Sequence, residues 1–169
     1  MELSSVAAIA RALQDDNIRY LVVGGLAVNA HGYQRFTSDL DLVIQLNPEN
    51  TRRALESLQI LGYKPRVPVT PEEFSIAENR RRWHEEKGML VLNLFSDKHR
   101  RTPIDIFISE PFDFDIEWEK STSMSIDPEV SIPVISLDAL LIMKKDAGRT
   151  KDLLDIEYLE RLKPYRDGL

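Results

Sequence analysis

Two glycines that close one apolar strand, followed by two aspartates in the next, constrain this 169-residue chain more than any other feature. Gly24 and Gly25 end the first segment, and a single leucine separates Asp39 from Asp41 in the second. Residues two apart in a strand share a face, so the aspartates project together while the leucines face the core. Two carboxylates about 4 Å apart repel by roughly 4 kcal/mol at an effective dielectric of 20. The pattern predicts a bound cation, and Mg²⁺ prefers carboxylates, waters and phosphates.

The glycine turn supplies the complementary half of such a site. Without a Cβ, Gly24 and Gly25 allow backbone N–H groups to approach a polyphosphate. Residues 25–31 are small and apolar, which predicts a short buried helix whose first N–H groups face the phosphates. Arg35, in the loop before the aspartates, is expected either to clamp a phosphate or to pair with an acidic residue.

A third aspartate, Asp105, lies in a segment that is apolar on both sides. Such a run is typical of a central strand covered on both faces. If this strand lies beside that of Asp39 and Asp41, three carboxylates can hold two metal ions. The alternative is that Asp105 caps a turn or pairs with Arg100 or Arg101.

These motifs resemble the nucleotidyltransferase superfamily with the DNA polymerase beta-like fold. Residues 24–41 are similar to the small single-domain members, which include lincosamide and aminoglycoside nucleotidyltransferases and AbiEii-like toxin proteins. Many members carry serine where this chain has its second glycine, so only a backbone N–H is offered there. The resemblance extends over about residues 18–162.

The C-terminal segment adds to the resemblance. Lys144 and the run with Arg149, Lys151, Asp152 and Asp155 resemble the lysine and Arg-x-Lys-Asp-x-x-Asp helix pair of this group. Lys144 is expected to reach the phosphates, or else to be an exposed lysine favoured by a helix C-terminus. The four-residue spacing of Lys151 and Asp155 favours a structural ion pair.

The resemblance implies an α/β (α+β) fold, in which helices flank a mixed central sheet and a helix pair ends the chain, with one domain over residues 1–169. It implies a metal-dependent enzyme that moves a nucleoside monophosphate from a nucleoside triphosphate to an acceptor hydroxyl and releases pyrophosphate. Asp39, Asp41 and Asp105 would be catalytic and would hold two Mg²⁺ ions, or Mn²⁺ in their place. The acceptor and the preferred base are not specified by any motif.

Composition narrows the class of protein. The chain has no cysteine and three histidines without ligand spacing, which excludes disulfides and argues against a zinc site. Without a membrane-length apolar run or a signal-like start, it is expected to be cytoplasmic. A net charge of −6 argues against a long nucleic acid as partner and leaves room for a short RNA end. Of two basic clusters, residues 80–82 and 98–101, the second is expected to border the site, and a solvated face is the alternative for both.

Two other functions stay open at this stage. One is a non-catalytic nucleotide-binding protein of the same fold, such as a partner in a toxin–antitoxin pair. The other is a toxin that modifies tRNA or protein, which would share the chemistry and have an antitoxin as partner. A homodimer is a further option, because a second subunit can complete a site on so small a domain.

Periodicity and turn residues predict the order of elements. Ser4 or Ser5 is expected to cap the first helix, and Trp83 or Trp118 is expected either to stack a base or to pack in the core. Helices are expected at residues 4–15, 25–31, 48–61, 71–80, 136–145 and 150–162. Strands are expected at 19–23 and 39–45, at 89–95 and 103–109 as a hairpin, and at 131–135 as an edge strand.

Overall fold

The computed structural model describes residues 1–166, with side chains through residue 162. The helices are α1 (Leu3–Asp15), α2 (Gly24–Ala30), α3 (Pro48–Ile60), α4 (Pro71–Ser75), α5 (Ala77–Lys87), α6 (Phe114–Lys120), α7 (Leu137–Ala147) and α8 (Thr150–Arg166). The strands are β1 (Tyr20–Val22), β2 (Leu40–Ile44), β3 (Tyr63–Pro65), β4 (Val91–Ser96), β5 (Ile104–Phe107), β6 (Thr122–Ser125) and β7 (Ser131–Val134). Every helix in this part of the chain is too short or too polar to cross a lipid bilayer.

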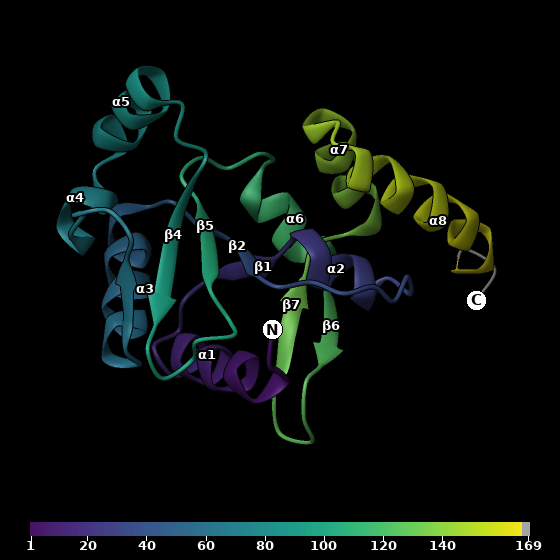
Figure 1. The fold of residues 1–169 in the computed structure, drawn as a ribbon, viewed down its shortest axis with the longest axis horizontal. Coiled ribbons are helices and arrows are strands. Elements are labelled where there is room, and N and C mark those ends of the chain that lie inside the picture. Colours follow the sequence, from purple (N-terminus) through teal and green to yellow (C-terminus); the bar gives the residue numbers. More distant parts are fainter. Residues whose placement is uncertain (167–169) are drawn as a thin grey trace.

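The strands form one mixed sheet in the order β3-β4-β5-β2-β1-β7-β6. Strand β2 lies inside it, antiparallel to β1 and parallel to β5. Figure 1 shows α4 and α5 beside the β3–β4 side of the sheet, and α7 and α8 at the other side. The expected mixed sheet with flanking helices and a C-terminal helix pair is confirmed.

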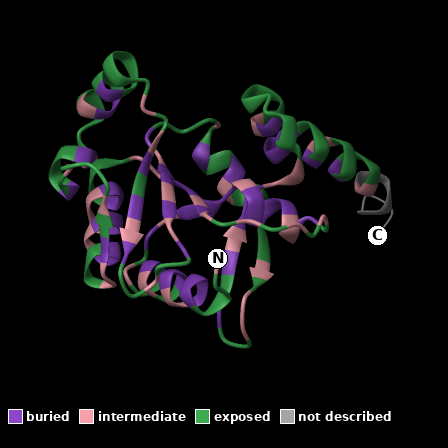
Figure 2. Ribbon diagram, viewed as in Figure 1, coloured by how far each residue is buried: buried purple, intermediate pink, exposed green. Residues whose placement is uncertain are grey.

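Alternate residues of the central strands build the core. Leu40 and Leu42 of β2 lie opposite Ile104 and Ile106 of β5, and each of the four side chains is at most 1% exposed. Helices α1 and α3 pack on each other, and α3 also contacts β2 and β3 while α1 contacts β7. Figure 2 shows buried residues concentrated on the strands and on the inner sides of these helices. The intervening residues of β2 and β5 therefore point to the opposite face.

Local capping residues explain where three of the helices begin. Helix α3 starts with Pro48 after Asn47, whose side chain accepts a backbone N–H. Ser136 caps α7 in the same way, while Thr70 and Glu73 form a capping box at α4. The sequence-based starts of these helices are confirmed.

Other expectations about the fold are wrong. Strand β7 is not at an edge, because β6 pairs with its outer side. The polar residues of β6 carry no apolar alternation, so the sequence does not indicate this strand, and β3 and α6 are also unexpected. Neither Ser4 nor Ser5 caps α1, because the helix begins at Leu3 after Glu2.

Candidate active site

Two aspartates meet on neighbouring strands. Asp41 of β2 and Asp105 of β5 are direct partners in the parallel pairing, so their side chains share the face opposite the leucine core. Asp39 immediately precedes β2, and all three aspartates line one cavity of about 380 Å³. A volume of this size is within the range of small-molecule sites. The expected neighbouring strands are thus observed, and they bring the three predicted carboxylates to one cavity.

The carboxylates repel one another electrostatically. Burial, followed by the charge of Asp105, raises the pKa of Asp41 to about 6. Burial, with a further contribution from Asp39, also raises the pKa of Asp105, although Asn93 opposes the shift by donating a hydrogen bond of 2.6 Å. No described side chain forms an ion pair with any of the three carboxylates. A cation in the cavity would relieve this repulsion.

The donor chemistry of these residues fits a hard divalent cation. Carboxylate oxygens that share a cavity and lack a basic partner are the ligands that Mg²⁺ or Mn²⁺ prefers. Within the described residues, however, no three acidic, histidine or cysteine side chains lie close enough together to form a ready-made metal site. The chain therefore offers the ligands for a metal without a preformed cage, and metal binding stays a prediction.

The glycine turn packs directly on the carboxylates. Gly24 has a φ of +63°, and a Cβ at this position would overlap the Asp41 carboxylate. A Cβ at Gly25 would overlap the hydroxyl of Thr37. Burial dominates the raised pKa of Asp41, and the nearby Gly25 N–H partly offsets that rise, while contact of the glycine turn with a phosphate stays a prediction. Both glycines are thus required for the close approach of the turn to the β2 end.

Alternating charges form a row beside the site, and we call Arg35, Asp155, Lys144, Asp152 and Arg149 the charge row. All of these except Asp155 line the cavity. Lys144 lies 2.9 Å from Asp152 and 2.8 Å from Asp155. Arg35 binds Asp155 through two bonds of 2.6 and 2.8 Å, and Arg149 binds Asp152 at 2.6 Å. The row connects the loop before β2 to α7 and α8.

The charge row revises several expectations. Lys144 is 4% exposed, so the alternative of an exposed lysine is wrong, whereas it does line the cavity and its contact with a phosphate stays a prediction. Arg35 takes the alternative foreseen for it, an ion pair with an acidic residue. Asp155 faces α7 and not Lys151, so the expected pair within α8 is absent from the described contacts.

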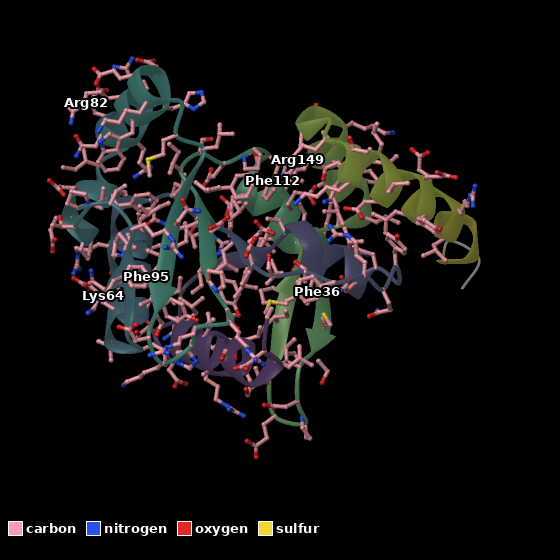
Figure 3. All side chains as sticks on the ribbon, viewed as in Figure 1. Phe36, Lys64, Arg82, Phe95, Phe112 and Arg149 are labelled. Atoms are coloured by element: carbon pink, nitrogen blue, oxygen red, sulfur yellow. The ribbon has the colours of Figure 1, made fainter. Side chains whose placement is uncertain are left out.

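Two further basic residues line the cavity and are exposed to solvent. Lys151 lines the cavity, is exposed and has no described ion-pair partner. The Arg149 side chain is 61% exposed although it pairs with Asp152. Figure 3 shows Arg149 where α7 meets α8. The sequence motif contains both residues, but only the packing of α8 shows which cations are accessible.

The remaining predicted features lie elsewhere. Residues 98–101 fold toward α1, where His99 stacks on Tyr63, and Arg101 lies near Glu2. The prediction that this cluster borders the site is wrong. The alternative in which Arg100 or Arg101 pairs with Asp105 is wrong as well. The tryptophans do not line the cavity and pack on phenylalanines instead. The aromatic side chains in the cavity wall are Phe36 and Phe107, which the sequence did not single out.

Comparison with known proteins gives one family match. Residues 7–168 match the family profile described as "Nucleotidyl transferase AbiEii toxin, Type IV TA system". No curated protein is similar enough to be matched.

Solved structures share the fold. The lincomycin-bound lincosamide antibiotic adenylyltransferase has a TM-score of 0.61 at 17% identity, covering 94% of this chain and 96% of its own. ANT(2″)-Ia in complex with adenylyl-2″-tobramycin has a TM-score of 0.57 at 12% identity, covering 98% and 95%. An antigenic nucleotidyltransferase-like protein from Paracoccidioides brasiliensis has a TM-score of 0.54 at 20% identity, covering 97% and 76%. At these identities the likeness shows a common nucleotidyltransferase fold.

Proposed function

Because the chain belongs to the AbiEii family of nucleotidyl transferases, we propose that it moves a nucleoside monophosphate from a nucleoside triphosphate to an acceptor hydroxyl. The observation that carries the proposal is the pairing of Asp41 with Asp105, beside a glycine turn that no larger residue could form. This arrangement combines repelling carboxylates with accessible cations in one cavity. Such a combination suits a polyphosphate bound together with metal ions.

We assign the metal ligands to Asp39, Asp41 and Asp105. When bound, divalent ions supply neutralisation of the phosphate charge and polarisation of the phosphoryl group. Lys151 and Arg149, at the cavity mouth, would attract the triphosphate and offset charge on the departing pyrophosphate. The protein contributes position and charge, which account for most catalysis of phosphoryl transfer.

The acceptor side of the site is assigned to Asp105. Its carboxylate would take the proton of the acceptor hydroxyl while the hydroxyl oxygen bonds to the α-phosphorus. The bond from that phosphorus to the bridging oxygen breaks, and pyrophosphate leaves with the bond electrons. The raised pKa of Asp105 makes it a better base than an ordinary carboxylate, and Asn93 fixes its orientation.

Calorimetric titration tests this function first. Wild-type protein should bind at least one of the four ribonucleoside triphosphates with Mg²⁺, and should bind it far more weakly in a chelating buffer. Asp39→Ala should lose the metal-dependent part while keeping the folded-state circular dichroism spectrum. If no triphosphate binds to the wild type under either condition, the proposed transfer is refuted. The triphosphate that binds most tightly can then be used in labelled form to screen for the acceptor.

A second candidate is a toxin with the same chemistry, acting on tRNA or protein and neutralised by an antitoxin. The family description, which names a toxin of type IV toxin–antitoxin systems, favours it. Induced expression should then arrest growth of the host, and Asp41→Asn should abolish the arrest at equal protein level. Growth arrest that persists with Asp41→Asn would show that toxicity does not depend on this site.

A further inference from the structure

Phe36 is a large apolar side chain presented to solvent at the mouth of the cavity. It is 84% exposed and lines the cavity together with the carboxylates and the glycine turn. Figure 3 shows it on the loop that precedes β2. An exposed phenylalanine gains nothing for the stability of the fold, whereas its flat face can stack on a planar ring. Its position beside a predicted nucleotide site therefore calls for a ligand.

The loop holds Phe36 in place from both sides. The Asn29 side chain accepts the Arg35 N–H at 3.0 Å and donates to the Arg35 carbonyl at 2.9 Å. The Arg35 guanidinium donates to the Phe36 carbonyl at 3.0 Å while it binds Asp155. On the other side, Thr37 packs on the glycine turn. The backbone at Phe36 is thus held in place, which keeps its exposed ring beside the cavity.

The position of the loop identifies the ligand. Thr37, the next residue, contacts Gly25, so the Phe36 loop lies on the side of the cavity where the glycine turn would support the donor phosphates. Asp105 and its partner Asn93, which we assign to the acceptor, belong to β5 and β4 on the other side of β2. A ring stacked on Phe36 therefore belongs to the molecule that carries the phosphates.

We propose that Phe36 stacks on the nucleobase of the donor nucleoside triphosphate. This inference rests on the proposed function and adds to it the contact that holds the base. Every nucleobase has a π-face, so stacking on Phe36 strengthens binding without selecting strongly among bases. Base preference, if the protein has one, comes from other groups in the cavity.

Calorimetric titration with two kinds of ligand tests the inference. The probes are the four ribonucleoside triphosphates and inorganic tripolyphosphate, which has the phosphates and no base, all with Mg²⁺. Phe36→Ala should weaken binding of the triphosphates about tenfold or more, and should change tripolyphosphate binding less than twofold. Phe36→Trp should retain triphosphate affinity. Ile60→Ala truncates an equally exposed side chain, 85% exposed on α3, and should change neither ligand.

The outcomes separate the two proposals. Unchanged triphosphate binding by Phe36→Ala overturns the stacking role while the proposed function stands. Equal weakening of both ligands also overturns it, because the loop and not the ring would then matter. A wild type that binds neither ligand refutes the proposed function, and the stacking role falls with it.

Discussion

Replacing Lys144 with methionine should destabilise the protein by about 3–5 kcal/mol, because it leaves two buried carboxylates without their shared cation. Lys144 is 4% exposed, and its partners Asp152 and Asp155 are 0% and 1% exposed. Methionine preserves most of the apolar stem, so loss of packing contributes little. For a chain of this length the destabilisation corresponds to a fall of roughly 10 °C in the midpoint of thermal unfolding.

The neighbouring residue supplies a matched control. Lys145 pairs with Glu160 at 2.9 Å, but both side chains are at least half exposed. A surface pair of this kind contributes about 0–1 kcal/mol. Urea denaturation of the wild type, Lys144→Met and Lys145→Met at pH 7 therefore compares a buried and an exposed lysine one position apart. If Lys144→Met loses no more stability than Lys145→Met, the charge row does not stabilise the fold.

The pH dependence of unfolding tests the same prediction in a second way. Burial alone would raise the pKa of Asp152, but hydrogen bonds from Arg149 and Lys144 outweigh it and lower the pKa to about 2. A lowered pKa contributes stability above about pH 4, and this contribution is lost as the pH falls toward 2. For Asp152 it amounts to about 2 kcal/mol. The gap between wild type and Lys144→Met should therefore be constant near neutrality and narrow between about pH 4 and 2.

Three further predictions concern the carboxylates and the glycine turn. In a chelating buffer at pH 7, Asp41→Asn should be more stable than the wild type by up to about 3 kcal/mol. The reason is that the folded-state pKa of Asp41 is raised to about 6, so the free energy of unfolding of the wild type falls as the pH rises through 6. Denaturation from pH 4 to 8 tests this, and a gap that does not close near pH 4 contradicts it. Gly24→Ala should remove Mg²⁺-dependent triphosphate binding, and it should destabilise the protein more than Gly88→Ala does. Gly88 has a similar φ of +62°, but a Cβ there would meet open space. Equal melting temperatures of the two variants would contradict the overlap with Asp41. Asn93→Ala should slow nucleotidyl transfer and leave triphosphate affinity within twofold, because Asn93 orients Asp105 and is not among the residues that line the cavity. An unchanged rate would remove its positioning role.

The sequence predicts those parts of the fold whose signals are local. Strands β1, β2, β4 and β5 have strong apolar character, and Pro48 and Ser136 mark helix starts without reference to the rest of the chain. Strand β6 is polar and is a strand only because β7 lies beside it. Strand β3 is as short as β1 but contains Lys64 and Pro65, so it lacks the apolar character that makes β1 recognisable. Tertiary pairing, which no local pattern records, defines both of these strands.

The same distinction applies to the site. Asp39, Asp41 and Asp105 could be identified because a charge in an apolar strand is unusual wherever the strand lies. The orientation of Lys144 depends on the packing of α7 against α8, so the sequence could not show that it faces two carboxylates. Phe36 resembles any apolar residue in the sequence, and only its 84% exposure distinguishes it.

The parallel pairing of β2 with β5 also has a consequence for the order of folding. Asp41 and Asp105 are partners across roughly 60 intervening positions, so their contact closes a long loop and should form late. The hairpin of β4 and β5 and the antiparallel pair of β1 and β2 are closer along the chain and can form first. Electrostatic repulsion between the carboxylates would then arise only when most of the apolar surface is already buried. Repulsion between the carboxylates at the centre of the sheet therefore does not slow the early steps of folding.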